Sequence, residues 1–348
     1  MLREKLVSSF MAFEEKIDVQ TDLHDIRTAA IKNFENKGFP TKKEEAWKYT
    51  SLNAILKNDF SVFPNTENTI EYRDVKKYFL HEIDSYKVVF VDGVFSSNLS
   101  STTHDGIDVC LMSSALNKPK YKMVIDTYFN QIASKDESLT SLNTAFANEG
   151  AYINIPKSKV ADKPIEIMYF STGSEKALLV QPRNLVIVGE NSHVQIIERH
   201  QCLNDNAVLT NSVTEIFAAK RAIVDYYKIQ NDAAEANLID NTYVSQKQES
   251  HVSVQTFSFG GNLTRNNLNF SHFLSTNENG IKVILYMTII TSMLVMIYKK
   301  ENELGFSIAK FNFYLEMQEW VGALLVVING GDLSKTPFRH VTIRSRIP

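Results

Sequence analysis

Residues 185–197 read LVIVGENSHVQII, and this stretch decides the fold class of the chain. An apolar run at 185–188 precedes the turn-forming residues Gly189-Glu190-Asn191, and a second apolar run follows at 194–197. Branched aliphatic residues fit a pleated, half-buried surface, whereas glycine and asparagine tolerate the backbone angles of a tight turn. The stretch therefore predicts a strand, a turn and a second strand.

The same alternation of apolar runs and turn clusters extends over residues 151–280. Further β-rich runs lie at 153–155, 165–167, 178–180, 223–227, 238–244, 252–259 and 263–270, and further turn clusters at 204–206, 231–232, 248–250, 260–262 and 275–280. Strands at this spacing, with no helix between them, predict a β-sandwich, a β-barrel or a β-solenoid. No sharp repeat motif separates the three architectures, so the pattern alone leaves them open.

Helical patterns and one hairpin precede this β-rich region. Residues 1–60 are predicted to be helical, with one amphipathic helix that starts near Thr21 and packs on another part of the chain. Residues 88–95 read VVFVDGVF and predict a β-hairpin, because Asp92-Gly93 supplies the positive φ angles of a type I′ turn. A further short helix is predicted within residues 136–149.

Residues 38–50 read GFPTKKEEAWKYT and separate two helical segments. The glycine suits the left-handed residue that ends a helix, and the proline prevents that helix from resuming. Thr41 and Glu44 have capping-box spacing, so each side chain can accept a hydrogen bond from a backbone N–H near the other at the start of a new short helix. That helix would carry Trp47, which we expect to be a packing anchor.

This run resembles the G-[LF]-P-T-[KR]-x-E-x-x-W-K-Y-T signature of the SufD family, scaffold subunits of SUF iron–sulfur cluster assembly. Residues 87–93, KVVFVDG, are similar to the VFVDG strand of that family, and the resemblance covers about residues 1–280. It implies a mainly β fold with N-terminal helices, a right-handed parallel β-helix core and an irregular or atypical C-terminal segment. The expected domains are an N-terminal helical and mixed α/β region (1–150), a β-helix core (151–280) and a divergent or frame-shifted tail (281–348).

The resemblance implies a non-catalytic scaffold and not an enzyme. SufD acts with the paralogous subunit SufB and with the ATPase SufC, and the iron–sulfur cluster lies at a shared subunit interface. We therefore expect a SufB-like and a SufC-like partner, no catalytic or cofactor-binding residues, and no cofactor bound by this chain alone. Two alternatives stay open. One is a β-helix enzyme that acts on polysaccharides, and the other is a protein-interaction scaffold that works independently of metal.

The C-terminal part departs from the family. Residues 283–298 form an apolar run without a charged residue, which as a helix would reach about 24 Å, less than the ~30 Å hydrocarbon layer. We expect no membrane span there, and both a buried element and an anomalous sequence stay open. The late Cys/His motif of the family and its C-terminal helices that dock onto SufC have no counterpart in residues 281–348. This departure leaves docking onto a SufC-like partner in doubt.

Composition excludes several other classes. The chain has 348 residues, 44% hydrophobic and 22% charged, and its formal net charge of −3 provides no basic field for nucleic acid. The first residues contain no long apolar run, so we expect no secretory signal and a cytoplasmic location. The two cysteines, Cys110 and Cys202, are too few for a disulfide framework or for an all-cysteine metal site.

One Cys/His pair could bind a metal. His200 and Cys202 are separated by one residue, which on a strand places both on one face, where they could bind a soft metal. Because iron–sulfur clusters usually take four ligands, two are a weak signal, and we expect no metal site and a structural or surface role for this pair. We expect Cys110 to be a small, buried apolar residue.

A β-helix enzyme would need charged side chains gathered on one face of the coil. The candidates for such a cluster are Asp225, Lys228, Asp240 and Arg265. Nothing in the sequence fixes their relative positions, and we expect them to be solvated surface charges.

Overall fold

The computed structural model describes residues 2–17, 21–48, 50–62, 70–80, 83–101, 106–172 and 177–271. The chain divides into two compact units, Met1–Thr276 and Asn277–Pro348, and all described residues belong to the first. The predicted tail from residue 281 onward, with its apolar run, lies outside the described residues. The domain boundary predicted at residue 150 stays a prediction. Among the described residues, no helix is long and apolar enough to cross a membrane.

Two helices begin the chain, α1 (Leu2–Ile17) and α2 (Thr21–Lys37). The second ends as predicted, because Gly38 has a φ of 70° and its N–H donates to the Phe34 carbonyl at 2.7 Å. The prediction that helix continues to residue 60 is wrong. Only the single-turn 3-10 helices η1 (Glu45–Trp47) and η2 (Ile55–Lys57) follow, since the proline and the turn residues after Gly38 stop longer helix formation.

Half of the predicted capping box forms. The Glu44 carboxylate accepts the Thr41 N–H at 2.9 Å, whereas the Thr41 hydroxyl accepts from Lys43, at 3.4 Å, and not from Glu44. Trp47 is only 2% exposed and packs in an apolar cluster with residues of α1 and α2, including Leu6. The predicted packing anchor is therefore buried where the N-terminal helices meet.

Short elements connect the helices to the main β region. They are β1 (Phe60–Ser61), α3 (Tyr72–Val75), η3 (Lys76–Tyr78), β2 (Tyr86–Val91), β3 (Val94–Phe95), β4 (Asp108–Leu111), α4 (Met112–Asn117), η4 (Pro119–Tyr121), α5 (Lys122–Tyr128) and α6 (Ser138–Ala145). The predicted hairpin is confirmed, because β2 and β3 are antiparallel and both Asp92 and Gly93 have positive φ. The helix predicted within residues 136–149 is α6, whose first turn is capped by the Glu137 carboxylate.

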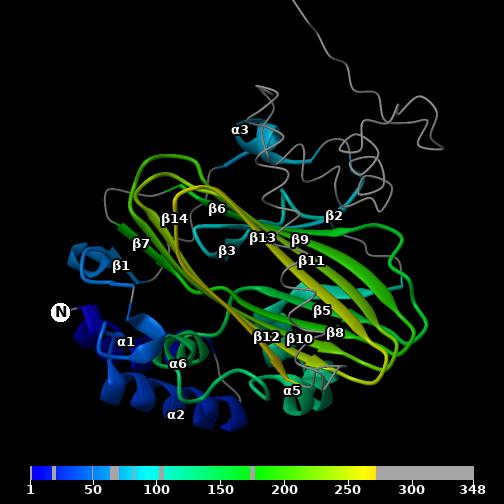
Figure 1. Cartoon of the computed structure of the whole chain (residues 1–348), viewed down its shortest axis with the longest axis horizontal. Helices are drawn as coiled ribbons and strands as arrows, with labels where there is room; N and C mark the ends of the chain where they lie inside the picture. Colours follow the sequence, from blue (N-terminus) through cyan, green and yellow to red (C-terminus); the bar gives the residue numbers. More distant parts are fainter. Residues whose placement is uncertain are drawn as a thin grey trace, which may run out of the picture. The chain divides into compact units, whose positions relative to one another are not determined.

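The remaining strands alternate between two sheets, except that β7 and β8 follow one another in the same sheet (Figure 1). Sheet A receives β5 (Ala151–Ile155), β7 (Ala177–Val180), β8 (Arg183–Val188), β10 (Val208–Ala218), β12 (Ala236–Gln246) and β14 (Asn262–Ser271). Sheet B receives β6 (Ile165–Ser171), β9 (His193–Cys202), β11 (Ile223–Asn231) and β13 (His251–Gly260). Neighbours among these strands are parallel, so the chain coils through both sheets in each turn. The predicted parallel β-helix is confirmed as a solenoid of about four turns.

Each turn of the solenoid takes about the same length of chain. Ile196 pairs with Tyr226, 30 residues further on, and Tyr226 pairs with Val254, a further 28 residues on. The corners after β5, β8, β10 and β12 repeat one backbone conformation, a non-glycine residue with φ between 56° and 60°, at Ser158, Asn191, Arg221 and Glu249. The turn predicted at 189–191 is one of these stacked corners.

Helices cover the outer face of sheet A. Leu139 and Leu142 of α6 pack with Leu209 of β10 and Ile239 of β12, and α4 and α5 pack over Tyr152 and Leu185. The outer face of the first sheet B strands is covered by residues of α3 and η3 and by Phe79. Between the sheets lies an apolar core that includes Ile153, Val186, Ile196, Ile216 and Val224. This arrangement leaves two buried places where polar side chains gather, one inside the solenoid and one under the helices.

Candidate functional site

Polar side chains occupy one part of the solenoid interior. Strand register places Tyr169, His200 and Gln230 in one row on β6, β9 and β11, and Glu198 beside Lys228 in the next row. Across the interior, Ser212 of β10 is in register with Asp240 of β12, and Thr214 with Thr242. These side chains alternate with residues that face outward, as the pleat of a strand requires. The polar rows therefore lie between the large apolar core around Ile196 and a smaller apolar cluster around Cys202 and Val208.

Glu198 is the centre of this interior network. Its carboxylate accepts the Tyr226 hydroxyl at 2.5 Å and contacts His200 Nε2 at 2.8 Å and Lys228 Nζ at 3.7 Å. The His200 ring stacks on Tyr169, with centroids 5.0 Å apart. Burial alone would raise the pKa of Glu198, but the Lys228 charge and the bonds from His200 and Tyr226 lower it to about 2. Glu198 is therefore a carboxylate that its neighbours hold in the charged form.

Lys228 joins Glu198 to the opposite sheet. Its ammonium donates to Asp240 Oδ1 at 2.6 Å and to the Thr242 hydroxyl at 2.8 Å. Burial disfavours the charged form of Lys228, yet the carboxylates of Asp240 and Glu198 raise its pKa. An ammonium held in this way stays charged and hydrogen-bonded, so it stabilises the contact between the sheets and is not a free nucleophile.

The pair His200 and Cys202 does lie on one strand, and both side chains are buried. His200 bonds Glu198, whereas Cys202 packs in an apolar cluster with Leu178 and Val208. Burial and the nearby Asp232 carboxylate raise the pKa of Cys202 to about 12, which keeps it a neutral thiol. No group of three or more His, Cys, Asp or Glu residues that could hold a metal ion occurs within the part of the chain that the structure describes.

Cys110 is less buried than predicted. It is only partly buried, at the rim of an apolar cluster that contains Tyr121 and Tyr152. Burial raises the pKa of this thiol. Its strand, β4, lies at the edge of sheet A, which explains why one side of the residue remains accessible.

The charges suggested for an enzyme do not gather on one face. Lys228 and Asp240 lie inside the solenoid, so the prediction that they are solvated surface charges is wrong. Asp225 faces outward on the same strand as Lys228 and contacts His193 Nε2 at 2.9 Å. Arg265 is placed by register beside Ile239 on β14. The buried pair has little access to solvent, and this arrangement suits stabilisation of the coil better than catalysis.

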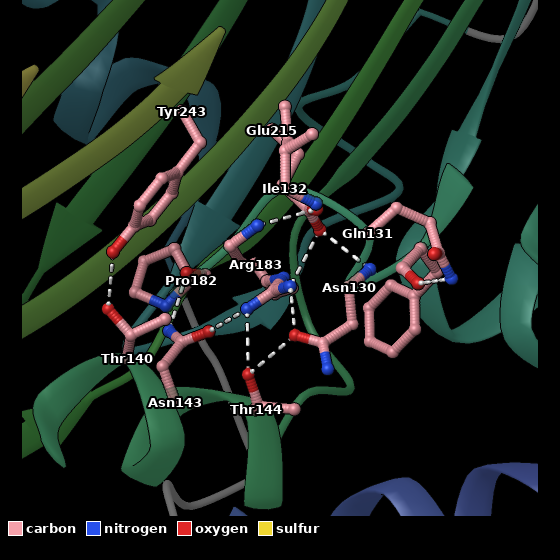
Figure 2. A network of polar contacts seen from close by, with 12 residues as sticks. Asn130, Gln131, Ile132, Thr140, Asn143, Thr144, Pro182, Arg183, Glu215 and Tyr243 are labelled. Carbon is pink, nitrogen blue, oxygen red and sulfur yellow. Dashed lines mark hydrogen bonds and ion pairs between the residues drawn. The ribbon is translucent and has the colours of Figure 1, made fainter. Parts of the chain in front are cut away.

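A second polar network joins the helices to the outer face of sheet A (Figure 2). Arg183 of β8 donates to Glu215 of β10 at 2.6 Å, and both side chains are fully buried. The guanidinium also donates to the Thr144 hydroxyl at 3.0 Å and to Asn130 Oδ1 at 3.3 Å, and it lies over the Phe129 ring at 5.0 Å. This arginine therefore holds the end of α6 and the segment after α5 against the sheet.

Glu215 and α6 complete that network. The carboxylate accepts three backbone N–H groups, those of Asn130, Ile132 and Ala133, at 2.9 to 3.2 Å. In α6, the Asn143 amide donates to the Pro182 and Asn211 carbonyls, each at 2.8 Å, and Thr140 bonds the Tyr243 hydroxyl at 3.0 Å (Figure 2). Sequence reasoning missed Arg183 and Glu215. Their separation of 32 residues, close to one turn of the solenoid, was the available signal.

Comparison with known proteins gives matches over most of the chain. Residues 3–167 match the SufBD protein N-terminal region, and residues 169–287 match the SufBD core domain of SUF system FeS cluster assembly. An iron–sulfur cluster assembly SufBD family protein of Synechocystis is 25% identical over 66% of this chain and 52% of its own length. The iron–sulfur cluster assembly protein SufD of Escherichia coli is 24% identical over 70% of this chain and 53% of its own length.

A chloroplastic protein of Arabidopsis thaliana, ABCI7, is 25% identical over 71% of this chain and 52% of its own length. The chain spans about half the length of these curated relatives. The two family models follow one another along the sequence, and together they cover most of the 348 residues. The chain belongs to the SufBD family of the SUF iron–sulfur cluster assembly system.

Proposed function

We propose that this chain is a non-catalytic scaffold subunit of iron–sulfur cluster assembly, located in the cytoplasm, and that it acts with a SufB-like paralogue and a SufC-like ATPase. The observation that carries the proposal is the pair of consecutive family matches along residues 3–287. The relatives from Synechocystis and Escherichia coli are named for iron–sulfur cluster assembly, which supports the same role here.

The buried side chains support a scaffold more than an enzyme. The two polar networks connect strands and helices through groups such as Arg183 and Lys228, which are at most 5% exposed and bonded to protein partners. Cys202 is a neutral thiol in an apolar cluster. We therefore propose that a cluster, which needs about four thiolate or imidazole ligands, is held at an interface with the paralogue.

The sheet edges support binding of another chain. Within residues 2–271 as described, β13 pairs with β11 alone and β14 pairs with β12 alone. Among the described residues, the outer backbone N–H and C=O groups of these two strands face no further strand, and edge strands of this kind can pair with a strand of a partner.

Anaerobic reconstitution with iron and sulfide tests the shared site. The isolated chain should hold no stable cluster, whereas a mixture with the SufB-like and SufC-like proteins of the same genome should hold one. A stoichiometric cluster on the isolated chain that is lost in His200→Ala or Cys202→Ala would contradict the proposal. Assembly with those proteins but without a cluster would favour the metal-independent scaffold, and turnover of a polysaccharide by the isolated chain would favour the enzyme.

A further inference from the structure

The corners after β5, β8, β10 and β12 stack along one edge of the solenoid (Figure 1). Hydrogen bonds join these corners, because the N–H of a left-handed corner residue donates to a carbonyl of the following turn. The three bonds are Ser158 to Glu190 at 2.8 Å, Asn191 to Lys220 at 3.1 Å and Arg221 to Gln248 at 3.0 Å. We call this stack of residues 156–158, 189–191, 219–221 and 247–249 the corner edge. Its turns are one strand spacing apart, about 4.8 Å.

A row of outward-facing side chains runs beside the corner edge. Each member lies two residues beyond a left-handed corner residue, and the members are paired in register: Val160, His193, Ile223 and His251. The next residue of each strand, such as Val194 or Val224, packs in the interior core, so this outer row faces the other way. Val160 is 61% exposed and Ile223 is 41% exposed. Two aliphatic side chains are therefore presented outward, with His193 between them.

Ion pairs engage the acidic side chains of the corner edge. The Arg221 guanidinium lies 3.1 Å from the Glu190 carboxylate and 3.7 Å from that of Glu249. The Lys157 ammonium lies 2.8 Å from the Glu190 carboxylate. Both carboxylates of the corner edge are therefore already paired with a cation.

Two lysines of the corner edge, Lys220 and Lys247, have no ion-pair partner among the residues that the structure describes. The acidic side chains beyond the outer row are bonded within the chain. Asp162 accepts a tyrosine hydroxyl at 2.9 Å, and Asp225 contacts His193 Nε2 at 2.9 Å. The corner edge thus carries excess positive charge beside an apolar row, in a chain whose formal net charge is −3.

The backbone of the corner edge indicates a role beyond stability. Arg221 and Glu249 have φ angles of 56° and 59°, in the left-handed region that glycine and asparagine adopt more easily. Their ion pair is 43% and 54% exposed, and exposed pairs contribute little to stability. Residues held in such conformations cluster at binding sites.

An acidic protein segment suits this surface better than nucleic acid does. Glu190 and Glu249 alternate with the basic side chains and would repel a continuous phosphate backbone. The outer row carries no Phe, Tyr or Trp on which bases could stack. Separate carboxylates, in contrast, can pair with the two lysines, because opposite charges across an interface attract.

We propose that the corner edge and the outer row form a docking surface for an extended, acidic segment of a partner protein. Its carboxylates pair with Lys220 and Lys247, and its aliphatic side chains cover Val160 and Ile223. The last two residues are two strand spacings apart, about 9.6 Å. In a polyproline II segment, residues three positions apart lie on the same side and about 9.3 Å apart. The segment therefore carries acidic residues and an aliphatic residue at every third position.

This surface lies on the turns and the outer face of sheet B, whereas the proposed pairing with another chain uses strand edges. The inference therefore does not depend on the scaffold role.

Fluorescence anisotropy with the full chain and a labelled peptide, EDLEDLED, tests the docking surface. The peptides QNLQNLQN and EDSEDSED, which lack the charge or the leucines, should bind at least about tenfold more weakly. A variant with Lys220→Glu, Lys247→Glu and Ile223→Ser should weaken binding of EDLEDLED by at least about tenfold.

The matched control makes the same chemical changes on the exposed surface of η4 and its neighbours, as Lys118→Glu, Lys120→Glu and Met123→Ser. It should change the Kd less than about twofold. No saturable binding of EDLEDLED up to 1 mM, or an equal loss in both variants, would overturn the proposal. Tighter binding of single-stranded DNA than of this peptide would also overturn it, in favour of a nucleic-acid surface.

Methyl NMR decides the case even if the triple variant does not fold. In the chain labelled at isoleucine δ1 methyl groups, the Ile223 signal, assigned with Ile223→Val, should shift when EDLEDLED is added. The signal of Ile26, a partly buried isoleucine of α2, should stay in place. Binding that leaves the Ile223 signal unmoved would overturn the proposal.

Discussion

Replacement of Arg183 by methionine tests whether the network under the helices stabilises the fold. Arg183 and Glu215 are fully buried and 2.6 Å apart, and Glu215 also accepts three backbone N–H groups. In Arg183→Met the carboxylate keeps those backbone bonds and loses its counter-charge. Because an unpaired buried charge is left behind, we expect the free energy of unfolding to fall by about 3–5 kcal/mol.

A double-mutant cycle separates the pair from its surroundings. Glu215→Gln removes the negative charge and should by itself cost a similar amount, since it leaves Arg183 buried without its partner. The double variant should cost less than the sum of the two single variants, by about 1–3 kcal/mol, because neither charge then remains unpaired. The assay is urea denaturation followed by far-ultraviolet circular dichroism, with the free energies extrapolated to water.

The exposed pair Arg221 and Glu190 is the matched control. Its ends are 3.1 Å apart, as in a good ion pair, but the side chains are 43% and 31% exposed. Arg221→Met should therefore cost less than about 1 kcal/mol. A cost for Arg183→Met that is no larger than this control, or costs that add in the double variant, would refute the reasoning that the buried pair fastens the helices to the sheet.

Four further predictions use other parts of the structure. Trp47→Ala should lower the free energy of unfolding by about 3–5 kcal/mol, and a loss below about 1 kcal/mol in urea denaturation would show that its burial is not important for stability. Gly150→Ala should lower the free energy of unfolding by at least about 2 kcal/mol in the same assay, because φ is 141° and an added Cβ would lie 2.1 Å from the carbonyl oxygen of Arg183. An unchanged urea midpoint would argue against this close approach. Cys202, with its pKa raised to about 12, should react with iodoacetamide at pH 8 only after unfolding, and rapid labelling of the folded chain would disagree. Glu198→Gln should reduce the loss of stability that the unchanged chain shows as pH falls below ~4.5, and an unaltered acid limb of the pH profile would count against the low pKa of about 2.

Local backbone rules account for the parts of the fold that could be predicted. Asp92-Gly93 forms the turn of the β2–β3 hairpin, and Gly38 ends α2, because both positions need a positive φ. Most strands carry enough aliphatic residues to be recognised. Strand β10 was missed, since its inward residues include Ser212 and Thr214 and its outward residues include Glu215, so no apolar run marks it. The pattern also left the choice among all-β architectures open, and the resemblance to a family made it.

The polar networks lay beyond sequence reasoning for a different reason. Lys228 and Asp240 are 12 residues apart but lie on opposite sheets, so only closure of the coil brings them together. A sequence shows two charges and gives no sign that both point inward. The spacing of His200 and Cys202 predicted a shared strand. In the structure, however, the His200 imidazole is hydrogen-bonded to the Glu198 carboxylate, whereas the Cys202 thiol packs among apolar residues. The contacts made inside the closed coil decide what each side chain does.

Co-purification tests the central claim most directly. The tagged 348-residue chain would be co-expressed with the SufB-like and SufC-like proteins of its own genome, isolated by the tag, and its assemblies weighed by native mass spectrometry. The account predicts an assembly that contains this chain together with the paralogue and the ATPase. Recovery of this chain alone, or only with copies of itself, while the other two proteins assemble with each other, would contradict the proposed scaffold role.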